Sequence, residues 1–170
     1  MASTEYEAVH AGGSLRLFHL READGGQVSL WDYHGRRNLV LFFMHSAECS
    51  GCRKLLELIS SAYDQLVAEE GEILVVVHAH LSDAAALKHE MGLRCPVLSD
   101  VSGEVFKQYG LLGSGKKPRA AIVVSDRFGE IYHVSISGEE HRLASVEDIL
   151  SWLGFIEIQC PESGAPEWPK

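Results

Sequence analysis

The stretch that decides how this chain folds is Leu39-Val40-Leu41-Phe42-Phe43-Met44-His45-Ser46-Ala47-Glu48-Cys49-Ser50-Gly51-Cys52. Its first six residues are apolar strand formers, and the run is too short to cross a membrane as a helix. After it, apolar residues recur at helical spacing, which predicts a helix over residues 49–68. A buried strand, a short loop and Cys-x-x-Cys at a helix N-terminus predict a reactive thiol, because the helix's unpaired N–H groups and positive dipole end stabilise a thiolate.

The two cysteines of this loop have the spacing of a redox pair. Cysteines three residues apart at a helix start can form a disulfide with little movement of the backbone. Arg53 and Lys54 follow directly and add positive charge to the first turn. We therefore predict that Cys49 and Cys52 are redox-active. Two buried thiols or half of a zinc site are the alternatives.

Composition indicates one globular domain in a reducing compartment. The chain has 170 residues, of which 46% are hydrophobic, enough for one full core. The first residues show no basic segment followed by an apolar stretch, so we expect neither a signal peptide nor a membrane span, and a cytoplasmic location. Four cysteines in such a compartment favour redox or metal chemistry over structural bridges. Acidic residues outnumber basic ones 24 to 15, so nucleic acid and membranes are not expected as partners.

Strand and helix patterns alternate along the chain, which predicts a mostly parallel sheet with helices on its faces. Ser82 is the expected N-cap of one helix, Gly92 its stop, and Ser145 with Asp148 a capping box for the last helix. A hairpin is expected around residues 126–129. The predicted strands are 15–20, 28–31, 39–44, 73–79, 97–99, 119–125 and 131–137, and the predicted helices are 49–68, 83–91, 101–109 and 145–152.

Four segments, taken together, are more specific than Cys-x-x-Cys alone. They are Gly26-Gln27-Val28-Ser29-Leu30 with Asp32-Tyr33-x-Gly35, then Phe42-Phe43, then Pro96-Val97-Leu98-Ser99-Asp100 with Gly103-Glu104-Val105 and Tyr109-Gly110, and finally Arg119-Ala-Ala-Ile-Val-Val with Gly129. Over about residues 15–152 the chain resembles the thioredoxin fold and, within it, the alkyl hydroperoxide reductase/thiol-specific antioxidant (AhpC/TSA) proteins, which are peroxiredoxin-like.

The resemblance implies an α/β, thioredoxin-like fold. In it, a central mixed β-sheet is flanked by helices, with an N-terminal β extension and a Pro-rich C-terminal tail. We accordingly divide the chain into an N-terminal segment (1–14), a redoxin domain (15–157) and the tail (158–170).

The active-site loop combines two patterns. Counted from Phe43, the peroxiredoxin pattern Pro-x-x-x-Thr-x-x-Cys places its proline at His45, its threonine at Cys49 and its peroxide-attacking cysteine at Cys52. The thioredoxin pattern instead makes Cys49 the attacking thiol and Cys52 the resolving one. We predict that Cys52 attacks and Cys49 resolves, because the loop length matches peroxiredoxins and because we expect Cys52 to lie nearer the helix N–H groups and Arg53. The opposite order would favour disulfide reduction.

Arg119 and Pro118 carry the same ambiguity. The resemblance places Arg119 where peroxiredoxins hold their active-site arginine, and its fork of donors can stabilise charge on the leaving oxygen of a peroxide. Thioredoxins instead place a cis-proline beside the disulfide, for which Pro118 is the candidate. An ordinary surface residue of a strand is the alternative for Arg119.

Other chemical candidates are weaker. His45 can orient a thiolate or join both cysteines as a metal ligand, and His78 and His80 share one face at a strand end, which suits metal or packing. Cys95 is either a second resolving thiol or a small core residue. Cys160 looks like half of a zinc knuckle whose second thiol is replaced by serine, so we expect a tail without metal.

These observations predict a thiol-dependent oxidoreductase with Cys49, Cys52 and Arg119 in its site and no cofactor or metal. We expect a peroxide as substrate and a thioredoxin-type thiol protein as reductant, with a homodimer as one open assembly. A protein disulfide reductase is the first alternative. A non-enzymatic redoxin that binds metal or senses redox state is the second.

Overall fold

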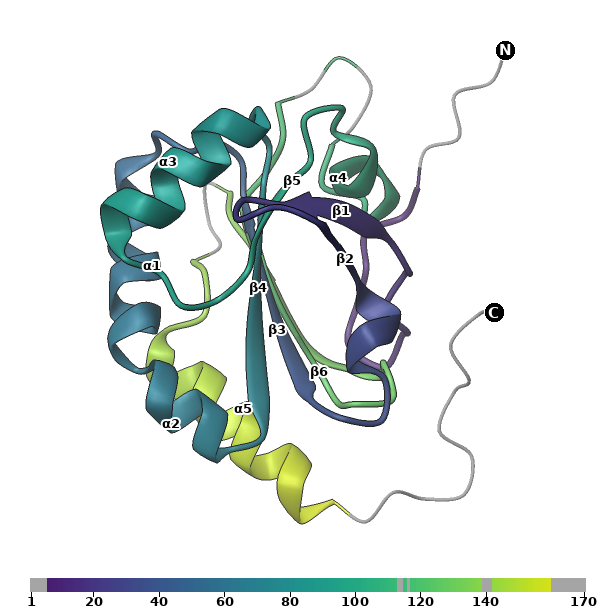
Figure 1. Cartoon of the computed structure of the whole chain (residues 1–170). Helices are drawn as coiled ribbons and strands as arrows, with labels where there is room; N and C mark the ends of the chain where they lie inside the picture. Colours follow the sequence, from purple (N-terminus) through teal and green to yellow (C-terminus); the bar gives the residue numbers. More distant parts are fainter. Residues whose placement is uncertain (1–5, 113–114, 116, 139–141, 160–170) are drawn as a thin grey trace.

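A single mixed sheet forms the centre of the molecule. The computed structural model describes residues 6–112, 115, 117–138 and 142–159. In this part of the chain, seven strands pair in the order β2-β1-β5-β4-β3-β6-β7 (Figure 1). Their bounds are β1 His19–Glu22, β2 Gln27–Ser29, β3 Asn38–Met44, β4 Gly71–Val77, β5 Val97–Ser99, β6 Ala121–Ser125 and β7 Ile131–Ile136.

The three central strands run parallel and the outer ones antiparallel. Phe42 of β3 pairs with Val75 of β4, and Val75 pairs in turn with Val97 of β5. β6 lies antiparallel to β3, with Ala121 opposite Phe43, while β7 and the β1–β2 ribbon close the two ends of the sheet. The mixed sheet that the family resemblance implied is confirmed. The mostly parallel sheet predicted from the alternating strand and helix patterns is wrong, because four of the six strand pairings described are antiparallel.

Strand β3 lies at the centre because every one of its residues is buried. Val40, Phe42 and Met44 pack into one apolar cluster, whereas Leu41 and Phe43 pack into a second cluster on the other face. Alternate side chains of a strand point to opposite faces, so a continuous apolar run belongs where helices or loops cover both faces. The segment that carries His45 and the two cysteines therefore begins at the carboxyl end of β3.

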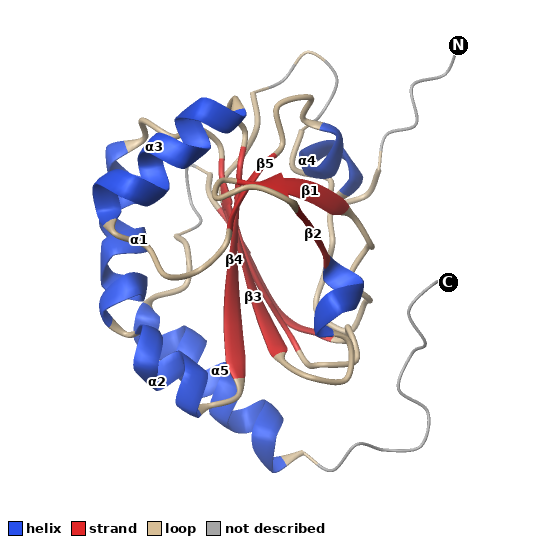
Figure 2. Ribbon diagram, viewed as in Figure 1, coloured by secondary structure: helices blue, strands red, loops and turns tan. Residues whose placement is uncertain are grey.

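Helices cover both faces of the sheet. Four pack on the Phe42 face: α1 Ser50–Ser61, α2 Tyr63–Ala68, α3 Leu81–Met91 and α5 Val146–Ile158 (Figure 2). On the Phe43 face lie α4 Glu104–Gln108, the 3-10 helix η1 Leu30–Tyr33 and the chain around Leu15 and Phe18. Among the described residues, no helix is both long and apolar enough to cross a membrane.

Several predicted elements need correction. The strand predicted over residues 15–20 starts only at His19. The N–H of Leu15 donates instead to the carbonyl of Gly129 (2.8 Å), in the turn between β6 and β7. The helix predicted over 49–68 is two helices, separated at Ala62, whose N–H is shared between the carbonyls of Leu58 and Ile59. A long-range hydrogen bond sets the first limit, and a local change of hydrogen bonding at Ala62 sets the second.

Helix starts were also misplaced by a few residues. α3 begins at Leu81 with His80 as N-cap, so Ser82 is not its cap. α4 begins at Glu104 and not at 101, because Gly103 before it is in the left-handed conformation with φ 77°. The Gly92 stop, the Ser145–Asp148 capping box and the β6–β7 hairpin are confirmed. Most of the predicted tail, residues 160–170, lies outside the described residues.

Candidate active site

Cys49 is the N-cap of helix α1, at the end of the loop that leaves the central strand. Its backbone is extended, with φ −63° and ψ 113°, and its Sγ accepts a hydrogen bond from the N–H of Cys52 at 3.4 Å. The residue is half-buried. The half-buried sulfur therefore lies at the positive end of the helix dipole, where it accepts one of the unpaired N–H groups of the first turn.

Cys52 lies one turn further along α1 and faces the sheet. It is only 4% exposed and packs in the apolar cluster that contains Phe42 and Leu56. Burial, followed by the hydrogen bond with Cys49, raises the pKa of the Cys52 thiol above its ordinary value. The two cysteines of the pair are thus unequal, because Cys49 is half-buried whereas Cys52 is almost fully buried.

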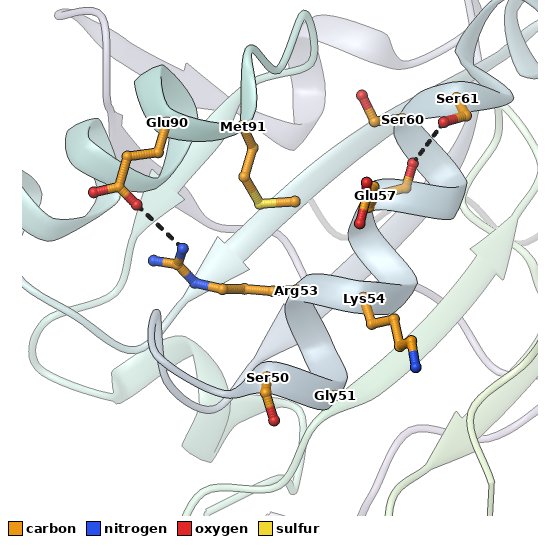
Figure 3. A pocket seen from close by; sticks show the side chains of 9 residues that line it. All are labelled: Ser50, Gly51, Arg53, Lys54, Glu57, Ser60, Ser61, Glu90 and Met91. Atoms are coloured by element: carbon orange, nitrogen blue, oxygen red, sulfur yellow. Dashed lines mark hydrogen bonds and ion pairs between the residues drawn. The ribbon is translucent and has the colours of Figure 1, made fainter.

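Our expectation that Cys52 lies nearest the helix N–H groups is wrong, because the Cys49 sulfur occupies the capping position. The expected contribution of Arg53 is not supported either. Its Nε donates to the Ala47 carbonyl (2.7 Å), and its Nη1 pairs with Glu90 of α3 at 3.1 Å (Figure 3). Arg53 thus braces the loop against α3, and its charge is partly neutralised there.

An open cleft lies beside the cysteine pair, between α1 and α3 (Figure 3). Arg53 reaches across it towards Glu90, while Met91 gives it a small apolar patch. Its lining residues are Ser50, Gly51, Arg53, Lys54, Glu57, Ser60, Ser61, Glu90 and Met91. Ser50 and Gly51 directly follow Cys49, so the cleft begins next to the loop that carries Cys49.

His45 lies beside the buried thiol. Its Nδ1 lies 3.7 Å from the Sγ of Cys52. The ligand atoms of His45, Cys49 and Cys52 all lie within 4.8 Å of one another, so these three side chains could hold a metal ion. His78 instead has its Nδ1 3.0 Å from the Asp100 carbonyl, and His80 is exposed at the start of α3. In the described part of the chain, neither belongs to a group of three ligands.

Arg119 stands at the edge of this site but turns away from it. The residue is exposed two positions before Ala121, which pairs with Phe43, and its Nη2 donates to the Gly110 carbonyl at 3.0 Å. Within the described ranges, no hydrogen bond joins it to either sulfur. All peptide bonds described are trans, so Pro118 is not the cis-proline that we considered.

The remaining cysteines play no visible part in the site. Cys95 is 3% exposed in the same apolar cluster as Cys52, and burial raises the pKa of its thiol to about 12. It is therefore a core residue, the alternative that the sequence left open. All three described cysteines are free thiols. Cys160 lies outside the described residues.

Sequence reasoning missed Glu90, the partner of Arg53. It lies 37 positions away on another helix, and no local pattern connects the two residues. It also missed that the Cys49 sulfur caps α1. That role had a visible signal, because an N-cap residue accepts from the N–H two or three positions on, which is the Cys-x-x-Cys spacing.

A thiol at a helix N-cap, a second thiol one turn behind it and a central mixed sheet define a thioredoxin-fold thiol oxidoreductase. The model of the AhpC/TSA family matches residues 11–134. The chain belongs to the AhpC/TSA family, as its sequence motifs predicted.

Known proteins agree with this assignment. The chain is 27% identical over 150 residues to a chloroplastic peroxiredoxin Q of Suaeda salsa, covering 85% of this chain and 68% of that protein. It is 24% identical over 139 residues to the thiol-disulfide oxidoreductase ResA of Bacillus thuringiensis, covering 81% and 75%. The crystal structure of peroxidoxin BcpB from Mycobacterium tuberculosis superposes with a TM-score of 0.77 at 24% identity, covering 86% and 97%. The expected thioredoxin-like fold is confirmed.

Proposed function

We propose that this protein is a thiol peroxidase in which Cys49 attacks the peroxide and Cys52 resolves the product. One observation carries the order of attack: the Cys49 sulfur is half-buried and accepts the N–H of Cys52 at the start of α1, whereas Cys52 itself is buried. A peroxide in solvent can reach only the first sulfur without opening the helix. Membership of the AhpC/TSA family and the peroxiredoxin relatives support a peroxide as substrate. This order reverses the one that loop length favoured.

The reaction runs in three steps. The Cys49 thiolate attacks one peroxide oxygen, so an S–O bond forms, the O–O bond breaks, and the other oxygen leaves as water or an alcohol after taking a proton. The Cys52 sulfur then attacks the resulting sulfenic acid, which forms the disulfide and releases water. Finally an external dithiol reduces the disulfide by exchange and leaves with its own disulfide.

Arg119 is the proposed stabiliser of the departing oxygen. Its guanidinium has the donor geometry for this role, and its backbone lies beside the end of β3, from which the reactive loop emerges. The side chain is exposed and bonded to the Gly110 carbonyl. It has to exchange that bond for one to the bound peroxide during the reaction.

The reductant is, we propose, a thioredoxin-type protein. The half-buried Cys49 is the sulfur of the disulfide that such a partner can attack, and the open cleft beside Ser50 and Gly51 leaves space for its approach. A cytoplasmic location would supply this reductant. A homodimer stays a prediction.

Disulfide reduction is the second candidate. A more accessible first cysteine and a buried second one are the thioredoxin arrangement, and the likeness to ResA adds support. In that case the Cys49 thiolate attacks a disulfide sulfur of the substrate, and Cys52 displaces the reduced substrate.

Mass spectrometry with two oxidants separates these functions. Reduced protein is mixed with one equivalent of hydrogen peroxide or of a small disulfide, quenched over time and peptide-mapped. A peroxidase forms the Cys49–Cys52 disulfide faster with peroxide, while Cys95 and Cys160 stay reduced. Protein that stays reduced in peroxide but exchanges rapidly with the disulfide would contradict the proposal and favour the reductase.

A further inference from the structure

We propose that the reduced protein binds one zinc ion through the Nδ1 of His45 and the sulfurs of Cys49 and Cys52. These atoms lie within 4.8 Å of one another, in a part of the chain where two rigid elements meet. His45 follows β3 directly, Cys49 is the N-cap of α1, and Cys52 lies in the first turn of that helix. The site goes beyond the proposed peroxidase function and does not depend on it.

The distances are close to those of a bound zinc ion. Tetrahedral zinc holds sulfur at about 2.3 Å and nitrogen at about 2.0 Å, so an S···N pair of ligands lies about 3.6 Å apart and an S···S pair about 3.8 Å. The observed His45 Nδ1 to Cys52 Sγ distance is 3.7 Å. The widest pair of the triangle has to close by at most about 1.2 Å, which side-chain rotation at the half-buried Cys49 can supply.

The donor set favours zinc over hard cations. Two thiolates and one imidazole are ligands that zinc prefers, while magnesium and calcium prefer oxygen. Three protein ligands leave a fourth position, which solvent can fill on the open side of Cys49. Binding releases the two thiol protons, so the thiols enter as thiolates and the complex of the three groups with Zn²⁺ is electrically neutral.

The charges around the site do not oppose a cation. The Arg53 guanidinium is paired with Glu90, and the Arg119 guanidinium donates to the Gly110 carbonyl, so both groups have other partners. The whole chain carries a formal net charge of −9. A divalent cation is therefore not repelled by an unpaired arginine of the loop.

Zinc and the redox reaction compete for the same two sulfurs. Oxidation of the zinc-bound pair by hydrogen peroxide forms the S–S bond, transfers two electrons from the thiolates to the peroxide, takes up two protons, makes two waters and releases Zn²⁺. The disulfide that forms cannot hold zinc, so the protein has either a zinc-bound reduced pair or a zinc-free oxidised pair.

Zinc binding to the reduced, metal-stripped full chain is measured by titration against a chromophoric chelator. We expect one equivalent to bind. His45→Ala should weaken binding at least about tenfold, and Cys49→Ser or Cys52→Ser should abolish it. His78→Ala and Cys95→Ser are matched controls that should bind as the parent does. His45→Asn provides a second variant if His45→Ala fails to fold, and cobalt absorption reports whether thiolates are ligands.

Absence of stoichiometric binding, or binding that survives all three ligand variants, would overturn the inference. Peroxide consumption by zinc-free protein is measured separately. If the protein consumes peroxide but binds no zinc, only the zinc proposal is overturned. If the protein binds zinc at these residues but does not react with peroxide, only the proposed peroxidase function is overturned.

Discussion

Two helices of this molecule, α1 and α5, begin with a side chain that accepts a hydrogen bond from the N–H three residues on. At α5 the Ser145 hydroxyl accepts from Asp148 (3.2 Å), and the Asp148 carboxylate accepts in return from the N–H of Ser145 (3.1 Å). At α1 the Cys49 sulfur accepts from Cys52 (3.4 Å), and Cys52 returns no such bond. Both helices thus have the same capping geometry, but the acceptor atom is a sulfur at α1 and a hydroxyl oxygen at α5.

The difference shows what each helix start is for. The first turn of α5 contains Glu147 and Asp148, whose negative charges complement the helix dipole, whereas the first turn of α1 contains no acidic residue. A thiol sulfur is a weak acceptor, and it becomes a strong one only as a thiolate. The start of α5 is therefore stabilised by two acidic side chains. At the start of α1, no carboxylate competes with the Cys49 sulfur for the positive end of the helix dipole.

Cys49→Ser separates capping from chemistry and has the largest expected effect. Peroxide consumption should fall at least about a thousandfold, because the attacking sulfur is gone. The free energy of unfolding should not fall, because serine is a preferred N-cap residue. Coupled peroxide assays and denaturant unfolding measure the two effects. Cys95→Ser is the control that keeps its turnover; a Cys49→Ser protein that still turns over would remove Cys49 from the first step.

Arg119→Ala tests whether the α1 site needs an added cation. Oxidation by peroxide should slow by more than about tenfold, a loss of about 1.4 kcal/mol in transition-state stabilisation, with a much smaller effect on exchange with a small disulfide. Lys117→Ala removes an exposed cation two positions away and serves as the control. Equal small effects on both reactions would make Arg119 a structural residue.

Ser145→Ala tests the other helix. Losing the serine cap should lower the free energy of unfolding by about 1 kcal/mol, while the rate of reaction with peroxide stays the same. Thermal unfolding and a single-turnover peroxide assay report the two quantities. A change in rate without a change in stability would mean that the two helix starts are coupled and do not serve separate purposes.

Glu90→Gln has the smallest expected effect. The Arg53–Glu90 pair is partly exposed, with 35% and 57% of the two side chains accessible, so its loss should cost less than about 1 kcal/mol of unfolding free energy. Oxidation of Cys49 should change by less than about twofold, since Arg53 keeps its bond to the Ala47 carbonyl. A large rise in rate would show that Arg53 acts on the thiol after all.

The sequence was sufficient for features that depend on neighbours along the chain. The buried run of β3, the cysteines at a helix start and the Ser145–Asp148 box all follow from spacing within a few residues. The same is true of the β6–β7 hairpin. Each was predicted from local rules, and each is present.

Features that depend on distant contacts could not be predicted. Leu15 is placed by a bond to Gly129, and Arg53 by an ion pair with Glu90 on α3. Burial decides the difference between Cys49 and Cys52, and burial depends on which face of α1 meets the sheet. The expectation that Cys52 lies nearer the helix N–H groups came from its place inside the first turn, and it is wrong because the Cys49 sulfur holds the capping position.

The unequal roles of the two sulfurs are tested most directly by trapping sulfenic acid in the single variants. Cys52→Ser and Cys49→Ser proteins receive one equivalent of hydrogen peroxide with a sulfenic-acid-specific reagent, and the adducts are mapped by mass spectrometry. We predict rapid labelling of Cys49 in Cys52→Ser and little labelling of Cys52 in Cys49→Ser. Rapid labelling of Cys52 in Cys49→Ser, with an unreactive Cys49 in Cys52→Ser, would contradict this account and restore the peroxiredoxin order of attack.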